Sequence, residues 1–583
     1  MAKKRPPRSA ENKPPPAPRP GFLRHLAVLL LLAAAGAAVY YPSLGGPFLF
    51  DDSGFISGNP LIRDFSAFFG GAAPSPVNEN VDIHFRTRAV AFFTFALNYA
   101  AGGLDPAGYR VVNLALHVLN SFLVYWLGLL LFAAVPGRAG AAAPAAAPGA
   151  ALAGSAAAAL LFLCHPMQTQ AVAYVSQRFA SLCALFCLLS LACYLRARLP
   201  SGARCRAWFY AASLLAAVLA MNTKENAFPL PFMIAGAEFL FFSAPLKARL
   251  KFLLPLALTA LIIPASLMSG GGGRSAAQAV TVSGGGEKAE VRSYALSQPG
   301  IVVSYLRLLA WPSGQNVDHD PPLRRAPGLP LLGSLLLLGA LAALGVRLAL
   351  AGGPLRAAAG FGIIWFFAML SVESSFIPLG DLMFEHRVYL PFAGLALAAG
   401  ALAASQFLEG RRAVVAAAAL LLCFGLGWAA RARAAVWASE EALWRDAAVK
   451  SPLKARPHYN LGSVLVRQER FAEGAGELEL ALAAEPENPD NADVYYNLGL
   501  ARARLEDFPR AEAAFLAALA LNPRRDSAWF NLGIVYLKQG KTAQARRQFE
   551  AALEANPGHA KARAKLEQLA AAAPGRGPAA LSR

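Results

Sequence analysis

Charged residues are scarce in this chain. Only 15% of its 583 residues are Asp, Glu, Lys or Arg, against roughly 25% in a typical soluble domain. Hydrophobic residues make up 56% of the chain, and the mean hydropathy is +0.42. This composition excludes an ordinary soluble globular protein and predicts an integral membrane protein.

Cysteine motifs and nucleic-acid motifs are also missing. The six cysteines show no CxxC pair and no Cys/His ligand spacing, and most lie inside apolar runs, where they are expected to act as small packing residues. The net charge of +19 could suit a nucleic acid, but the sequence has no RNP or zinc-finger pattern. Its basic residues gather instead in the N-terminal tail and in short loops. We therefore expect no nucleic-acid partner.

The N-terminus has no convincing signal-peptidase site. Residues 1–21 are Pro-rich and basic and predict a disordered cytoplasmic tail. The apolar run at 22–41 is long enough to cross a bilayer and is followed by Tyr40-Tyr41-Pro42. We interpret it as an uncleaved first span.

Long apolar runs recur through residues 22–436 and predict a polytopic α-helical membrane domain of about eleven spans. They lie at 22–41, 110–134, 150–165, 180–196, 207–221, 226–243, 252–268, 329–350, 358–371, 388–407 and 412–430. With a cytoplasmic N-terminus, every inside loop is basic, as the positive-inside rule requires. This topology places the C-terminal part of the chain on the outer face.

Three connecting segments have distinctive compositions. Residues 136–150 predict an Ala/Pro/Gly linker, and residues 269–300 predict a mobile Gly/Ser-rich outer loop. The segment 301–312 is too short to span and predicts an amphipathic helix on the membrane or beneath that loop.

An internal repeat follows the last span. Tyr459-Asn-Leu-Gly recurs as Tyr496-Asn-Leu-Gly and Phe530-Asn-Leu-Gly, at offsets of 37 and 34 residues. This is the period and pattern of tetratricopeptide repeats, whose paired helices stack into a solenoid with a concave groove. We expect the solenoid to cover 437–571, with a capping helix at 558–571 and a disordered tail at 572–583.

Ionisable residues beside the predicted spans converge on the outer face. Such residues are costly near a bilayer and are functional candidates by default, and their convergence from distant loops predicts an active site. They are Asp51, Asp52, His84, Arg86, Arg88, His165, Arg178, Lys224, Glu225, Arg307, Asp318, His319, Asp320, Glu373, Asp381, Glu385, His386 and Arg387, together with Gln177.

The acidic pair Asp51-Asp52 follows the first span directly. It could be solvated and cap the next helical turn. It could also act as a general base, because a hydroxyl is a poor nucleophile until its proton is removed in the transition state, and repulsion between adjacent acids raises one pKa. A third reading is a divalent metal site, since hard cations prefer carboxylate oxygen. The dipeptide alone does not choose among these.

Two roles are open for each of the other candidate residues. Lys224 and Glu225 could form an ion pair in a turn, and Arg307 could snorkel to the interface. Arg178, Arg307 and Arg387 could equally bind a phosphate. The run Asp318-His319-Asp320 could bind a metal, although an ordinary polar loop is favoured. Asn460, Asn497 and Asn531 could line a peptide groove in the solenoid.

Several segments together resemble a known family, the transmembrane and tetratricopeptide-repeat O-mannosyltransferases and their bacterial relatives. They are FLFDDSGFISGNPLI (48–62), the segment 85–125 beginning FRTRAVAFF, LCHPMQTQAVAYVSQRFASL (163–182), NTKENAFPLP (222–231), SYLRLLAWPSGQNVDHD (304–320) and DLMFEHRVYLP (381–391). Two features depart from the family pattern: the repeat array is short, and the loop at 269–300 is rich in glycine.

The resemblance implies a C-type-fold glycosyltransferase that moves a sugar, mannose in the named family, from a polyprenyl-phosphate donor to a hydroxyl. It implies catalysis at Asp51 and Asp52. It also implies donor-phosphate or structural roles for His165, Arg178, Lys224, Glu225, Arg307, Asp318, His319, Glu385, His386 and Arg387. Arg86, from the group of ionisable residues above, is a further candidate for binding the donor phosphate or the substrate.

Our expectation is a membrane glycosyltransferase whose site faces the periplasm, because the Ala- and Arg-rich composition suggests a GC-rich bacterial genome. The repeats would present a protein or glycan acceptor, or recruit a protein partner, and would do no chemistry themselves. The alternative is a non-catalytic membrane-anchored scaffold for envelope assembly, which would need no convergence of charges. A transporter would place charges in mid-span and repeat its span halves, and neither pattern is present.

Overall fold

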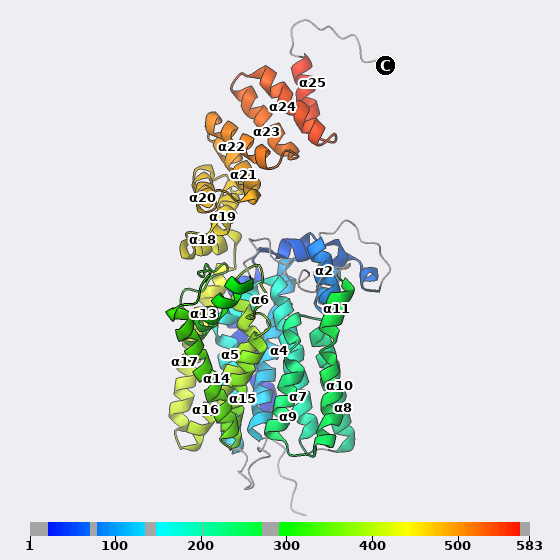
Figure 1. The fold of residues 1–583 in the computed structure, drawn as a ribbon, viewed down its shortest axis with the longest axis vertical. Coiled ribbons are helices and arrows are strands. Elements are labelled where there is room, and N and C mark those ends of the chain that lie inside the picture. The colour runs from blue at the N-terminus through cyan, green and yellow to red at the C-terminus, as the bar shows by residue number, and fades with distance from the viewer. Residues whose placement is uncertain (1–20, 70–78, 134–146, 201, 271–290, 572–583) are drawn as a thin grey trace, which may run out of the picture.

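The described residues of the computed structural model are 21–69, 79–133, 147–200, 202–270 and 291–571. They form a helical bundle with a curved stack of shorter helices rising from one end (Figure 1), and none of them lies in a β-strand. The expected disordered tails, and all but 147–150 of the linker predicted at 136–150, lie outside these residues. The predicted fold class, a polytopic α-helical domain followed by a tetratricopeptide solenoid, is confirmed.

Among the described residues, the bundle contains the α-helices that precede residue 437. They are α1 Phe22–Leu44, α2 Glu79–Thr87, α3 Ala89–Gly102, α4 Pro106–Ala133, α5 Pro148–Cys164, α6 Thr169–Ala173, α7 Arg178–Arg198, α8 Ala203–Met221, α9 Leu230–Phe241, α10 Leu246–Thr259, α11 Ile262–Gly270, α13 Val291–Ala310, α14 Leu329–Leu350, α15 Pro354–Leu370, α16 Tyr389–Leu408 and α17 Arg412–Val436.

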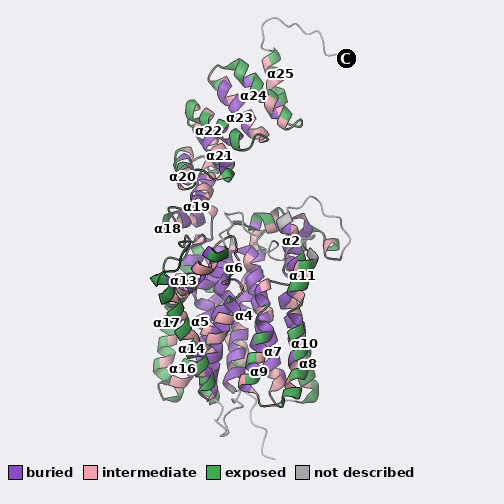
Figure 2. Cartoon of the chain, viewed as in Figure 1, coloured by how far each residue is buried: buried purple, intermediate pink, exposed green. Residues whose placement is uncertain are grey.

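Eight helices among the described residues are long and apolar enough to cross a membrane, or nine if α5 and α6 form one bent span. The predicted spans at 226–243 and 358–371 correspond to α9 and α15, which have 12 and 17 residues. The outer helices α14 and α17 are strongly apolar, yet only 17% of their most apolar windows is buried. Exposed residues follow these helices along the outside of the bundle (Figure 2). Such a surface suits lipid rather than water.

The segment after α11 departs from expectation. Residues 291–300 were predicted to lie in a mobile loop, but α13 begins at Val291 and continues to Ala310. The reason is a buried face that includes Tyr294, Ile301, Tyr305 and Leu308, whose spacing of three, four and seven residues is helical. The predicted surface helix at 301–312 is therefore the end of a longer, half-buried one. Residues 271–290 lie outside the described part.

Glycines allow neighbouring spans to approach closely. A Cβ atom built on Gly362 of α15 would lie 2.2 Å from the carbonyl oxygen of Gly394 in α16, and the reverse contact is also 2.2 Å. Small residues at such crossings let helix backbones pack without a hydrophobic driving force from water. The crossing positions the start of α16, beside which His386 and Arg387 lie.

We expect Gly362→Ala to lower the stability of the bundle by roughly 1–3 kcal/mol, because the added methyl group must push two backbones apart. The matched control is Gly339→Ala in α14, where a Cβ would meet no atom within 4 Å. Thermal melting in detergent would check the pair. Equal melting temperatures would show that the α15–α16 crossing relaxes freely.

The solenoid contains α18 Glu440–Lys450, α19 Ala455–Arg467, α20 Phe471–Ala484, α21 Ala492–Arg504, α22 Phe508–Leu521, α23 Asp526–Lys538, α24 Thr542–Ala555 and α25 Ala560–Ala571. The repeated glycine has a packing cause. A Cβ on Gly462, Gly499 or Gly533 would lie 2.6–2.7 Å from the facing Leu478, Phe515 or Phe549. Only glycine lets the two helices of each unit meet at this distance.

Candidate active site

A cavity of about 710 Å³ lies at the end of the bundle from which the solenoid rises (Figure 1), and its lining includes Arg456 of the solenoid. Its wall contains both apolar and charged residues. The apolar ones include Ile263, Leu267, Phe228 and Phe376. The charged and titratable residues of the wall are Asp51, His84, Arg88, Lys224, Glu225, Glu373, Asp381, His386, Arg387 and Arg456. A cavity with this lining can hold a molecule that has an apolar part and an anionic part.

Asp51 enters this cavity from a strained piece of backbone. The preceding residue, Phe50, has a φ of 53°, which is an outlier for a bulky side chain. Phe50 is fixed there by ring contacts with Tyr174, Phe384 and Trp444 at centroid distances of 6.0, 6.5 and 5.6 Å. The backbone N–H of Asp51 donates to the Tyr174 hydroxyl at 2.9 Å. Strain that surrounding contacts maintain at a cavity wall is typical of functional sites.

Burial raises the pKa of Asp51 above its ordinary value, and the nearby Asp381 adds to this effect, while Tyr174 and Arg456 oppose it. A carboxylate with a raised pKa is a better proton acceptor than an exposed one.

Asp52 has a different role from Asp51. It is fully buried and does not line the cavity. Its two oxygens accept from the backbone N–H groups of Leu49 at 3.1 Å and Ser176 at 2.7 Å. Burial raises the pKa of Asp52 to about 6, although these two hydrogen bonds favour the charged form. Asp52 therefore ties the loop after α1 to the short turn Val175–Gln177 before α7.

Lys224 and Glu225 both line the cavity but do not pair with each other. Lys224 Nζ contacts Glu373 Oε1 at 2.5 Å, and Glu225 accepts from Arg88 Nε and Nη2 at 3.2 and 3.0 Å. The alternative of a local Lys224–Glu225 ion pair is therefore wrong, because the short turn Glu225–Ala227 points the two side chains to different partners.

Of the three arginines in the cavity wall, Arg88 and Arg456 form ion pairs with carboxylates, whereas Arg387 binds backbone carbonyls. Its guanidinium donates to the backbone carbonyls of Leu382 at 3.0 Å and Asp381 at 2.7 Å. Its neighbour His386 is held by a backbone hydrogen bond to Gln170, and its Nδ1 has no hydrogen-bond partner among the described residues. Arg387 therefore keeps its positive charge for an anionic ligand, and His386 offers a nitrogen beside it.

The remaining predicted residues fall outside the cavity wall. Glu385, Asp318 and His319 lie just behind it, where Glu385 accepts from His319 at 3.0 Å and from Asn316 N at 2.6 Å. His165 is buried and bonds to the Leu309 carbonyl. Arg86 pairs with Asp82 on the same helix, and exposed Arg307 bonds to the Ser313 carbonyl.

Arg178 is also placed differently from the sequence expectation. It is fully buried and donates to Asn113 Oδ1 at 2.8 Å, to the Thr94 carbonyl at 3.1 Å and to the Tyr109 carbonyl at 2.9 Å. These hydrogen bonds give Arg178 a packing role, and its role as a donor-phosphate ligand stays a prediction.

No group of three His, Cys, Asp or Glu side chains in the described residues could hold a metal ion. Asp51 and Asp52 do not form such a site together, since both Asp52 oxygens accept backbone N–H groups.

Arg456 was missed by the sequence analysis. It belongs to α19 of the solenoid, yet it lines the cavity and donates to Asp381 at 2.8 and 3.3 Å. The signal for it was the basic pair Lys454 and Arg456 at the start of the first complete repeat.

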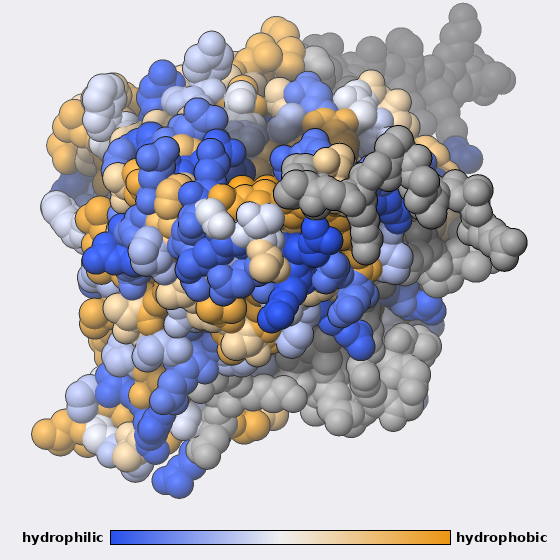
Figure 3. All heavy atoms as spheres, turned by 90° about the horizontal axis from the view of Figure 1, so that it is seen from above, coloured by the Kyte–Doolittle hydropathy of each residue, from blue (hydrophilic) through white to orange (hydrophobic). Residues whose placement is uncertain are grey.

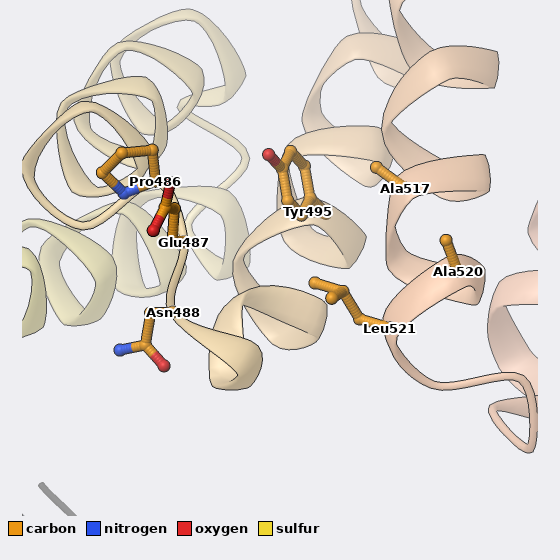
Figure 4. Close-up of a pocket in the computed structure, with 7 residues that line it drawn as sticks. All are labelled: Pro486, Glu487, Asn488, Tyr495, Ala517, Ala520 and Leu521. Atoms are coloured by element: carbon orange, nitrogen blue, oxygen red, sulfur yellow. The ribbon is translucent and has the colours of Figure 1, made fainter. Parts of the chain in front are cut away.

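The solenoid itself has a cavity of about 270 Å³, lined by Pro486, Glu487, Asn488, Tyr495, Ala517, Ala520 and Leu521. Figure 4 shows the Tyr495 ring between the turn at Pro486 and the helix that carries Ala517. Asn460, Asn497 and Asn531 do not line it. Asn497 and Asn531 donate across repeats to Ser463 and the Tyr496 hydroxyl, so their groove role stays a prediction.

Comparisons with known proteins agree with the two-part fold. The tetratricopeptide repeat family model matches residues 459–526, 496–560 and 530–581. The protein O-mannosyl-transferase F38B6.6 of Caenorhabditis elegans is 32% identical over 177 residues, which are 29% of this chain and 23% of that protein. The human protein O-mannosyl-transferase TMTC4 is 33% identical over 212 residues, 34% of this chain and 27% of that protein.

The chain thus matches about a quarter of the length of these relatives. Among solved structures, ArnT from Cupriavidus metallidurans bound to undecaprenyl phosphate is 13% identical, with a TM-score of 0.41 over 87% of this chain and 81% of that one.

Proposed function

We propose that this chain is a membrane glycosyltransferase that moves a sugar from a polyprenyl-phosphate donor to a hydroxyl acceptor. The observation that carries the proposal is Asp51, which follows a strained residue and lines a cavity with both charged and apolar residues in its wall. The similarity to protein O-mannosyl-transferases supports mannose as the sugar and a Ser or Thr hydroxyl as the acceptor.

The proposed chemistry is an inverting displacement. Asp51 takes the proton of the acceptor hydroxyl as its oxygen bonds to the anomeric carbon of the sugar. The bond between that carbon and the donor phosphate breaks, and the lipid phosphate leaves with its negative charge. Arg387 stabilises this charge, because its guanidinium is not neutralised by a direct carboxylate contact. The apolar residues of the cavity wall contact the first part of the lipid.

The membrane location and orientation belong to the same proposal. The basic inside loops favour an inner-membrane protein with a cytoplasmic N-terminus. The cavity and the solenoid then face the periplasm. Figure 3, viewed from the solenoid end, displays a largely hydrophilic surface with scattered hydrophobic patches, which suits a water-facing side. The acceptor and any protein partner would arrive from there.

The test is transfer by the purified full chain in liposomes. The liposomes contain radiolabelled undecaprenyl-phosphate mannose, and the bath contains a mixture of Ser- and Thr-rich peptides. We expect label to move from the lipid to peptide, and a phosphomonoester lipid to accumulate in equal amount. No transfer from this donor, or from the corresponding glucose, galactose and aminoarabinose lipids, would favour the scaffold alternative.

A further inference from the structure

The first solenoid repeat contacts the bundle through a group of four charged residues, here called the docking cluster: Asp318, Asp381, Lys454 and Arg456. Lys454 pairs with Asp318 and lies 3.7 Å from Asp381. Arg456 lies 2.8 Å from Asp381 and 3.5 Å from Asp318. Both acids come from outer loops of the bundle and both bases from the solenoid, so the cluster joins the two parts of the chain.

An apolar core beneath the docking cluster fixes its position. Trp437, at the junction of α17 and α18, stacks on Tyr174 at a centroid distance of 5.5 Å. Trp444 of α18 packs in the same core as Leu49, just before the strained residue Phe50. The solenoid and the segment that carries Asp51 therefore share one hydrophobic core. This packing fixes the position of Arg456 relative to the cavity.

Arg456 faces the same cavity as Asp51. Its guanidinium carbon lies 5.6 Å from the centre of the Phe50 ring, next to Asp51 in the chain. A positive charge at this place opposes the repulsion between Asp51 and Asp381. In return, although burial alone would lower the pKa of Arg456, Asp381, Asp318 and Asp51 raise it.

Other charged and titratable groups also surround Asp51. Tyr174 contacts it, Asp52 lies behind it, and the rest of the cavity wall contributes His84, Arg88, Lys224, Glu225, Glu373, His386 and Arg387. Arg88 and Lys224 are already paired with Glu225 and Glu373. The charge state of the Asp51 carboxyl group therefore depends most directly on Tyr174, Asp381 and Arg456.

We propose, resting on the function proposed above, that Arg456 of the solenoid is a positioning residue of the transfer reaction. It holds Asp381 and its loop against the cavity and keeps the Asp51 carboxylate ionised for its role as base. The solenoid is then a structural part of the active site, and the base is fully competent only when the first repeat is docked.

The experiment follows the protonation of Asp51 with and without Arg456. The full chain is titrated in liposomes and followed by infrared difference spectroscopy. Subtracting the spectra of Asp51→Asn from those of the wild type isolates the carboxyl band of Asp51. This measurement needs no sugar donor. Arg456→Gln should move the midpoint of this band to higher pH, because a favourable charge is lost. Asp381→Asn should move it to lower pH, because a repelling charge is lost, and Arg456→Lys should restore most of the wild-type value.

The rate of sugar transfer by the variants should change in step with the midpoint of the Asp51 titration. On the acid side, Arg456→Gln should reduce kcat/KM about fivefold, as expected when one nearby charge is lost, while the loss should be smaller on the alkaline plateau. The matched control is Arg502→Gln, which removes an arginine of the solenoid that pairs with Glu479 and Asp507. It should change neither the infrared midpoint nor the pH profile, and melting curves should show that each variant is folded.

The outcomes separate the two proposals. Transfer by the wild type with an Asp51 midpoint that is the same in Arg456→Gln would overturn the role of Arg456 alone. Absence of transfer by the wild type from every lipid donor would overturn the proposed function and this inference with it, whatever the infrared result.

Discussion

Replacing Asp51 with Asn is expected to reduce sugar transfer by roughly 10²–10⁴-fold, the usual contribution of a general base. The substitution preserves size and polarity but removes the proton acceptor. Asp51 opens onto the cavity, and its backbone N–H keeps the hydrogen bond to the Tyr174 hydroxyl in the variant, so the melting temperature should change little. The measurement is kcat/KM for transfer from lipid-linked sugar in liposomes.

Asp52→Asn is the matched comparison. An amide has one acceptor oxygen, so it cannot accept from both Leu49 and Ser176 as the Asp52 carboxylate does. We therefore expect a lower melting temperature and a partial loss of transfer. Full transfer by Asp51→Asn together with complete loss in a stable Asp52→Asn would show that the roles of the two acids are reversed.

The acid side of the pH profile should report Asp51. Burial raises the pKa of Asp51, and only its ionised form can accept a proton. As the pH falls, kcat/KM should therefore decline at a higher pH than an aspartate with an ordinary pKa of about 3.9 would give. A profile that is flat down to that value would contradict a base whose pKa is raised by the surrounding protein.

Replacing Arg178 with Lys is expected to lower the free energy of unfolding by roughly 3–5 kcal/mol, because buried acceptors lose their donors at about 1–3 kcal/mol each. The guanidinium serves Asn113, Thr94 and Tyr109 at once and lies 4.6 Å from the centre of the Phe95 ring. An ammonium group cannot reproduce this fork. Thermal and denaturant unfolding in micelles would measure the loss.

Arg307→Lys is the control for Arg178→Lys, since Arg307 is exposed and bonds only to the Ser313 carbonyl among the described contacts. It should unfold like the wild type. If Arg178→Lys were stable and instead raised the KM for the lipid donor, Arg178 would be a phosphate ligand, as the sequence first suggested.

The fold was predictable because two constraints act on short stretches of sequence. Backbone groups in a bilayer must be satisfied within each segment, so long apolar runs become helices. The Asn-Leu-Gly repeat marks the close helix contacts of the solenoid, as at Gly499 and Phe515. The start of α13 at Val291 was missed because its buried face includes serine and glutamine as well as apolar residues.

The site was predictable only in outline. Convergence on one face correctly grouped Asp51, Lys224 and Arg387 in one cavity. It could not assign partners, because adjacent residues such as Lys224 and Glu225 pair with chain segments more than a hundred residues away. Nor did it single out Arg456, because the basic pair Lys454 and Arg456 reaches the cavity only through the way in which the solenoid docks on the bundle.

The two ends of the solenoid differ in how they are held: the first repeat is packed on the bundle, whereas the last helices pack on other solenoid helices. The first repeat shares its core with Leu49 and Tyr174, whereas the last helices, such as α24 and α25, pack chiefly on neighbouring solenoid helices. In a stack held by nearest-neighbour contacts, units far from the bundle can be added, lost or altered at little cost to the rest. The distal repeats are therefore free to diversify in sequence and number, while the repeat that carries Arg456 must evolve together with the membrane domain.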